Sequence, residues 1–236
     1  MRAAVDRVPP AAWVGLWLVL LALAWDATGW DLAVMRLWGD AQGFALRHQP
    51  WLSGVAHDGT RRALVWVLVA WLLLLAWGRG PVREWAGRER LAVALGTVLA
   101  LLVVNLIKRA SLTSCPWDLA EFGGSAQYVS HWVLGVADGG GAHCFPGGHA
   151  SSALAFVAAA LPLLSRPERT RQGLLLLGAL LLGGAWLGAV QTVRGAHYPS
   201  HTLWTMVICY AVGGATWWLV QRTAAARQRP YQPSPM

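Results

Sequence analysis

The sequence predicts an all-α membrane protein, a polytopic bundle of six transmembrane helices. Hydrophobic residues make up 56% of the 236 residues and charged residues 13%, whereas about a quarter of the residues in soluble domains are charged. Many of the 16 tryptophans stand at the ends of apolar runs, as in the aromatic belts of membrane interfaces. Six such runs lie at about 10–25, 63–77, 91–107, 150–164, 173–190 and 202–220.

Several runs are close to 15 residues long, below the ~20 residues of a full span. We therefore expect the helices to extend into the flanking tryptophan, glycine and alanine residues. The first run has an alternative reading as a cleaved signal peptide ending near Ala22-Leu23-Ala24, which would leave five spans. A membrane domain over residues 1–221 and a disordered cytoplasmic tail over 222–236 complete the expected organisation.

The basic residues in the connectors predict the orientation of the bundle. One side holds 12 of the 19 basic residues, namely Arg2, Arg7, Arg79, Arg83, Arg88, Arg90, Arg166, Arg169, Arg171, Arg222, Arg227 and Arg229. The other side holds Arg36, Arg47, Arg61, Arg62, Lys108, Arg109 and Arg194, spread over longer loops. The positive-inside rule makes the first side cytoplasmic, with both termini inside. Topology thus accounts for the net charge of +8, and nucleic acid is not an expected partner.

Three segments on the predicted outer side carry residues suited to catalysis. Lys108, the only lysine, precedes Cys115-Pro116-Trp117. The other two segments are Phe145-Pro146-Gly147-Gly148-His149 and Arg194-Gly195-Ala196-His197-Tyr198-Pro199-Ser200-His201. Glycine brings backbone N–H groups close to an anion, and histidine transfers protons or attacks phosphorus near neutral pH.

In order and spacing, these segments resemble a divergent bacterial branch of the type 2 phosphatidic acid phosphatase superfamily. That family has the signature K-x6-R-P, P-S-G-H and S-R-x5-H-x3-D, and the resemblance covers about residues 90–210. It implies an integral membrane phosphatase in the cytoplasmic (inner) membrane, with its site facing outside. The implied substrate is a phosphorylated lipid, such as an isoprenyl diphosphate or phosphatidic acid. No cofactor and no metal are implied, and membrane lipids are the other expected partners.

The resemblance also assigns roles to individual residues. His197 would attack phosphorus and form a phosphohistidine, and His149 would protonate the leaving oxygen. Lys108, Arg194 and the amides of Gly147 and Gly148 would hold the phosphate oxygens, helped by the positive end of a helix that starts near His149.

The chain departs from the signature at four positions. Cys115 and Gly147 stand where the family has arginine and serine. Gln191 replaces a second arginine, although Arg194 would lie on the same helix face one turn later. His201 replaces the aspartate that orients the nucleophile. A neutral His201 can accept a hydrogen bond from the His197 ring but cannot offset its positive charge. We consider Asp118 or Glu121 as a source of the missing carboxylate.

The sequence is also compatible with other interpretations. Cys115 and Cys144 lie in the long outer loop, where a disulfide, free thiols or zinc ligands are all compatible with the sequence. A zinc hydrolase would gather Cys115, Cys144, His143, His149, His197 and His201, although Pro199 opposes a helical turn between the last two. Phosphotransfer to another acceptor and a catalytically degenerate lipid-phosphate-binding protein are the remaining alternatives. His131 and Asp138 belong to no motif.

Overall fold

The computed structural model describes residues 10–227, apart from the side chains of residues 55–58, 61 and 224–227. Its long helices are α1 (Pro10–Thr28), α3 (Thr60–Trp77), α4 (Gly87–Ala110), α7 (Thr170–Val193) and α8 (Pro199–Arg227). The run at 150–164 forms α5 (Gly148–Leu154), a 3-10 helix (Ala155–Ala160) and α6 (Leu161–Leu164) in succession. Every apolar run of the sequence is therefore helical, and most of the helices extend into the flanking residues as expected.

Short elements connect these helices. They are α2 (Trp30–Met35), the antiparallel strands β1 (Gly39–Asp40) and β2 (Gly43–Phe44), a π-helix (Trp51–Gly59) and 3-10 turns at Gly80–Val82, Pro116–Asp118, Ala120–Phe122 and Pro167–Arg169. Gly39 pairs with Phe44 in the two-stranded ladder. Most of these elements belong to the outer loops predicted from the sequence.

Four helices of the described part are long and apolar enough to cross a membrane: Pro10–Thr28, Gly87–Ala110, Pro167–Val193 and Pro199–Thr223. Two further apolar helical segments, Arg62–Trp77 and Gly148–Leu164, are shorter. The structure thus supports a helical membrane protein with four candidate spans, and a count of six depends on these two shorter segments.

The last helix extends further than predicted. α8 continues to Arg227, past the expected domain boundary at residue 221, because alanines at 224–226 favour helix. Residues 228–236 of the expected tail lie outside the described residues, as do Arg2 and Arg7.

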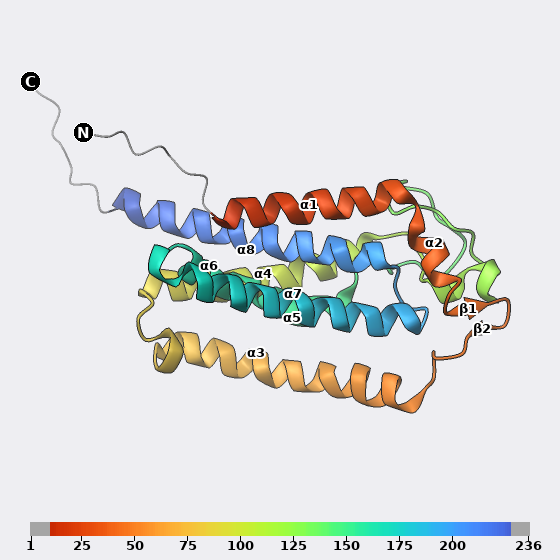
Figure 1. The fold of residues 1–236 in the computed structure, drawn as a ribbon, viewed down its shortest axis with the longest axis horizontal. Coiled ribbons are helices and arrows are strands. Elements are labelled where there is room, and N and C mark those ends of the chain that lie inside the picture. Colours follow the sequence, from red (N-terminus) through yellow and green to blue (C-terminus); the bar gives the residue numbers. More distant parts are fainter. Residues whose placement is uncertain (1–9, 228–236) are drawn as a thin grey trace, which may run out of the picture.

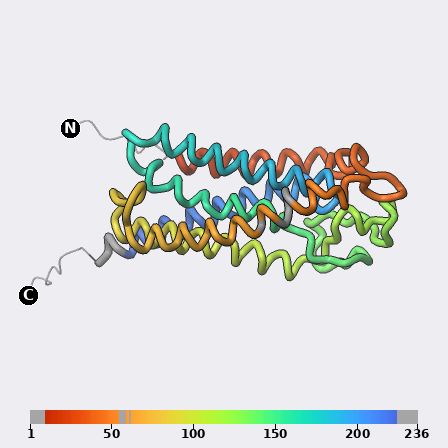
Figure 2. The backbone as a smooth tube through the Cα atoms, turned by 90° about the horizontal axis from the view of Figure 1, so that it is seen from below, coloured from red at the N-terminus to blue at the C-terminus, as the bar shows by residue number. Residues whose placement is uncertain are grey.

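The helices run alternately in opposite directions along one long axis (Figure 1). The three motif segments lie at the end of the bundle where α1 finishes and α8 begins, together with α2 and the β-strands. The connectors that follow α3 and α6 lie at the opposite end, as the view turned by 90° also shows (Figure 2). The arginine-rich connectors and the motif segments are therefore at opposite ends, which the predicted orientation requires.

Helix α8 packs against α1, α4, α5 and α7. Small residues bring these helices close together. A Cβ atom added at Gly96 would lie 3.1 Å from the Cβ of Ala158 and 3.4 Å from the Cα of Gly213. Such contacts between small residues are typical of membrane helices, whose association depends on close packing.

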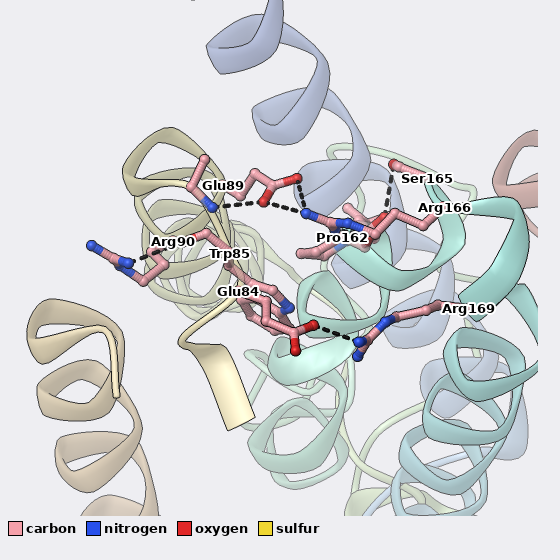
Figure 3. Close-up of polar contacts among 10 residues, drawn as sticks. Glu84, Trp85, Glu89, Arg90, Pro162, Ser165, Arg166 and Arg169 are labelled. Carbon is pink, nitrogen blue, oxygen red and sulfur yellow. Dashed lines mark hydrogen bonds and ion pairs between the residues drawn. The ribbon is translucent and has the colours of Figure 1, made fainter. Parts of the chain in front are cut away.

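Ion pairs join the helices at the end opposite the motifs (Figure 3). Glu89 accepts a hydrogen bond from the Ala86 backbone at the start of α4, at 2.8 Å. Its two carboxylate oxygens also lie 3.0 and 2.7 Å from Nη2 of Arg166, which follows α6. Arg169 pairs with Glu84 beside it. These pairs hold the first turn of α4 against the α6–α7 connector.

Candidate active site

Lys108 reaches the candidate site from the last turn of α4. Its side chain passes over the start of α5, because a Cβ atom added at Gly148 would lie 3.5 Å from the Lys108 Cδ and 4.0 Å from Nζ. The first and second motif segments, 40 residues apart in the chain, are thus in contact. These distances correspond to ordinary van der Waals contact.

The second motif segment begins a helix as predicted, since α5 starts at Gly148. The expected role of Gly147 is corrected, however. Its N–H donates to the carbonyl oxygen of His201 at 3.2 Å, and its own carbonyl accepts from Thr205 Oγ1 at 3.2 Å. Gly147 therefore attaches the start of α5 to α8, and its amide is not directed at a phosphate.

The third motif segment lies between α7 and α8. Gly195 has a positive φ of 78°, which allows the chain to turn out of α7. Pro199 is the first residue of α8, so His197 precedes the helix and His201 lies in its first turn. Proline is well suited to this first position because it needs no hydrogen bond from its nitrogen.

Asp31, which belongs to none of the three motif segments, holds this helix start in place. Its carboxylate accepts hydrogen bonds from the Ser200 backbone N–H at 3.0 Å, from the Ser200 hydroxyl and from Trp25 Nε1 at 2.9 Å. Asp31 is buried and belongs to α2, so it connects this outer helix to Ser200, which directly precedes His201. A carboxylate at a helix N-terminus is also favoured by the helix dipole.

His197 and His201 face each other through their Nδ1 atoms, 3.3 Å apart. Both rings are buried, and His201 is 1% exposed. The sulfur of Cys144 also lies 3.4 Å from Nδ1 of His197. One edge of the His197 ring therefore rests on His201 and Cys144, while the residue itself lines a cavity.

This cavity has a volume of about 540 Å³ and receives residues from all three motif segments. Five of the predicted site residues line it, namely Lys108, Gly148, His149, Gln191 and His197. Its apolar members include Leu64, Val65 and Leu68 of α3, Leu101 of α4 and Phe156 of the 3-10 helix after α5. Polar and apolar groups thus share one cavity, whose apolar wall was not predicted from the motifs.

Gln191 and Arg194 contact each other as their spacing predicts. Arg194 Nη1 donates to Gln191 Oε1 at 3.2 Å, and Arg194 Nε donates to the Arg47 carbonyl at 3.2 Å. Gln191 lines the cavity, whereas Arg194 does not. The buried Nε2 of Gln191 has no hydrogen-bond partner among the described residues. Arg194 thus contacts Gln191 and the Arg47 carbonyl, and Gln191 is the member of this pair that lines the cavity.

The two carboxylates considered for the nucleophile have other partners. Asp118 accepts from the Cys115 backbone N–H at 3.2 Å, within its own turn. Glu121 pairs with Arg36 at 2.5 Å. Neither contact involves His197. His201, which stands at the aspartate position of the signature, is the residue that contacts the His197 ring.

Cys115 and Cys144 form a disulfide, which resolves the alternatives left open by the sequence. The ligand atoms of Cys144, His197 and His201 lie within 4.8 Å of one another. A disulfide sulfur is not the thiolate that zinc requires, however. The donor set expected for a zinc hydrolase is thus incomplete at both cysteines.

A cluster of aromatic and polar side chains around His131 lies next to the His201 ring. The His131 ring stacks on Phe145 at a centroid distance of 4.4 Å, and its Nε2 lies 3.4 Å from the Asp26 carboxylate. Trp132 and Trp204 donate to the same carboxylate at 2.9 and 2.7 Å. Burial lowers the pKa of His131, while Asp26 acts in the opposite direction. Apart from Phe145, these residues belong to no motif, and only their tertiary contacts bring them to the site.

A model of one protein family matches this chain. It is described as the PAP2 superfamily, and the match covers residues 90–225. The matched range contains all three motif segments, the whole of α5 to α7 and most of α4 and α8. Comparison with curated proteins and with solved structures gave no match.

Proposed function

The chain belongs to the PAP2 superfamily, and on this premise we propose that it is a membrane phosphatase acting on a lipid phosphate or diphosphate through a phosphohistidine. The observation that carries the proposal is the shared cavity. Lys108, His149, Gln191 and His197 line it together with an apolar wall, which suits a phosphate joined to a hydrocarbon chain.

His197 is the proposed nucleophile. Its Nδ1 is directed at His201, so we assign the attack to Nε2. If Nδ1–H donates to Nδ1 of a neutral His201, Nε2 carries the lone pair that attacks phosphorus. The N–P bond forms as the bond from phosphorus to the leaving oxygen breaks.

His149 is the proposed general acid. It stands in the first turn of α5 and lines the same cavity as His197. It would give a proton to the leaving oxygen in the first step and take one from the attacking water in the second. Hydrolysis then releases inorganic phosphate and restores the His197 imidazole.

The phosphate oxygens would be held by Lys108, by Gln191 Nε2 and by the backbone N–H of Gly148. Charge in phosphoryl transfer resides mainly on the equatorial oxygens, so these donors stabilise the transition state. Gln191 supplies a directed hydrogen bond where the family has a guanidinium. Arg194, held by the Arg47 carbonyl, keeps the Gln191 amide in this orientation.

The proposed setting is a six-span bundle in the cytoplasmic membrane with the site at its outer face. The two shorter helical segments, Arg62–Trp77 and Gly148–Leu164, would supply the fifth and sixth spans. The motif end is opposite the arginine-rich connectors, which supports this orientation (Figure 2). The phosphate of a membrane lipid would then meet Lys108 at headgroup level.

The proposal is tested by phosphate release from detergent-purified protein. Substrates are phosphatidic acid and a polyisoprenyl diphosphate, and the proteins are wild type, His197→Ala and His48→Ala, an exposed histidine outside the site. We expect turnover in wild type and His48→Ala, none in His197→Ala, inhibition by vanadate and no loss with EDTA. Loss with EDTA that zinc restores would contradict the mechanism.

The intermediate itself is detectable with a ³²P-labelled substrate. Acid-labile, base-stable label on wild-type protein and its absence from His197→Ala would identify phosphohistidine. Lipid binding without turnover in both proteins would instead indicate a degenerate binding protein, the alternative that His201 in place of aspartate suggests. Turnover that appears only with an added alcohol acceptor would indicate a phosphotransferase.

A further inference from the structure

The disulfide joins a cysteine that lines the cavity to one whose sulfur lies against the proposed nucleophile. Cys115 lines the cavity, whereas Cys144 is fully buried. The Cys144 sulfur lies 3.4 Å from Nδ1 of His197 and 2.9 Å from the carbonyl oxygen of Ala196. No motif of the family signature includes this sulfur contact.

The disulfide also lies where three chain segments meet. The Cys144 backbone N–H donates to Thr113 at 2.9 Å, and the Trp117 N–H donates to Gly195 at 3.0 Å. These bonds join the segment after α4, the segment before α5 and the loop before α8. The disulfide therefore cross-links chain segments that surround His197.

We propose that the Cys115–Cys144 disulfide is a redox-controlled positioning element that keeps His197 in its nucleophilic form. The inference rests on the proposed function. A disulfide sulfur is uncharged, so it packs against the imidazole without favouring its protonation. The Nδ1–H group of His197 is then shared with His201, and Nε2 keeps its lone pair.

A dithiol reductant reverses this state through Cys115, the half-buried partner that lines the cavity. Its thiolate attacks the sulfur of Cys115, forming a mixed disulfide there, and the Cys115–Cys144 bond breaks with its electron pair on Cys144. The second thiol of the reductant then closes its own disulfide and releases Cys115. Overall, the reductant gives two electrons and two protons to the cysteines.

The released Cys144 thiolate lies against the His197 ring. Titratable groups on the elements packed around this ring are Lys108 of α4, His149 of α5, Arg194 of α7, His201 of α8 and, in the loops, His131 and Asp118. Apart from Asp118, which accepts from the Cys115 backbone, these groups are bases, neutral or positively charged, and they do not oppose a thiolate. The negative charge of the thiolate favours the imidazolium form of His197, and this form has no lone pair for attack on phosphorus.

Two matched variants separate this effect from loss of a cross-link, both made with Cys209→Ala to remove the other thiol. Cys115→Ala leaves a thiol against His197, whereas Cys144→Ala removes it, and each breaks the disulfide. We expect the acidic limb of the kcat/KM pH profile to move up by about one pH unit or more in Cys115→Ala and not in Cys144→Ala. Wild type treated with dithiothreitol should behave like Cys115→Ala and recover on reoxidation. Equal losses in both variants, without a shift, would overturn the proposal.

A second measurement needs no turnover. The Cys144 thiol of Cys115→Ala is titrated with methyl methanethiosulfonate over a range of pH, with mass spectrometry as the readout. We expect its apparent pKa below the ~8.5 of an ordinary cysteine, and a return to that value in Cys115→Ala/His197→Ala. The same value in both proteins, or a thiol unreactive at every pH, would refute the proposal. This result stands whether or not lipid phosphatase activity is found.

Discussion

The Nδ1 atoms of His197 and His201 lie 3.3 Å apart, so a hydrogen bond between the rings requires one to donate and the other to accept. A carboxylate at position 201 would always accept. A histidine accepts only when neutral and protonated at its other nitrogen. The activity of the site should therefore depend on an acceptor at position 201.

Replacement of His201 tests this dependence. We expect His201→Phe, which keeps the bulk of the ring and removes the acceptor, to lower kcat by about 100-fold, because the tautomer of His197 is then no longer fixed. His201→Asn offers a carbonyl oxygen and should lose less. Steady-state kinetics with one lipid phosphate provides the measurement. Equal activity in His201→Phe and wild type would show that the contact has no catalytic role.

Gln191 should contribute to binding of the phosphate. Gln191 lines the cavity, its buried Nε2 has no hydrogen-bond partner among the described residues, and a hydrogen bond to a charged group is worth about 1.5–3 kcal/mol. We therefore expect Gln191→Leu to weaken vanadate inhibition and to lower kcat/KM by about 10- to 100-fold. Gln191→Glu should be worse, because its negative charge repels the phosphate. Gln42→Leu, at an exposed glutamine, is the control and should match wild type.

The sequence predicted the helices and the motif ends well because both depend on local features. Apolar runs mark the membrane helices, and the glycines of 147–148 mark the start of α5. The hydrogen bonds of individual groups were not predictable in this way. The Gly147 amide matches a phosphate ligand of the family motif, yet it donates to His201, 54 residues later in the chain. Only the packing of α5 on α8 decides this.

Asp31 was missed for the same reason. It lies 169 residues from Ser200, outside the range matched by the family, and nothing in its neighbourhood indicates a catalytic role. The one available signal is that a chain with 11 acidic residues places one of them next to an apolar run. The disulfide was foreseen as an option, but its contact with His197 could not be, because the sequence does not give the fold of the loop.

Asp31 should stabilise the start of α8. Asp31→Ala removes the acceptor for the Ser200 N–H and hydroxyl, and the loss of such a buried cap costs about 1–2 kcal/mol. We expect a lower thermal midpoint in detergent and a smaller loss in Asp31→Asn, which keeps one oxygen. Glu168→Ala, at an exposed glutamate, should leave the midpoint unchanged. An unchanged midpoint in Asp31→Ala would mean that α2 does not hold this helix.

His131 should make stability depend on pH. Burial lowers its pKa in the folded state, below the 6.5 of an unperturbed histidine, so the unfolded chain binds the proton more readily. The stabilisation is complete above about pH 6.5 and is lost as the pH falls towards the folded-state pKa. His131→Phe keeps a ring to stack on Phe145, and thermal midpoints measured against pH should decline less steeply on the acidic side. Identical slopes for the two proteins would exclude His131 as the titrating group.

The ion pairs Glu89–Arg166 and Glu84–Arg169, at the end of the bundle opposite the motif segments, should differ in strength (Figure 3). Arg166 meets both oxygens of Glu89, and their side chains are 27% and 12% exposed, whereas Arg169 and Glu84 are 38% and 51% exposed. Exposed pairs contribute about 0–1 kcal/mol because water screens them and their side chains lose entropy on pairing.

Double-mutant cycles on thermal stability, with alanine at each position, should therefore give a coupling energy above about 1 kcal/mol for Glu89–Arg166 and a smaller one for Glu84–Arg169. Added salt should reduce the second coupling more than the first. Equal couplings would indicate that solvent reaches both pairs alike and that the first turn of α4 is held by packing alone.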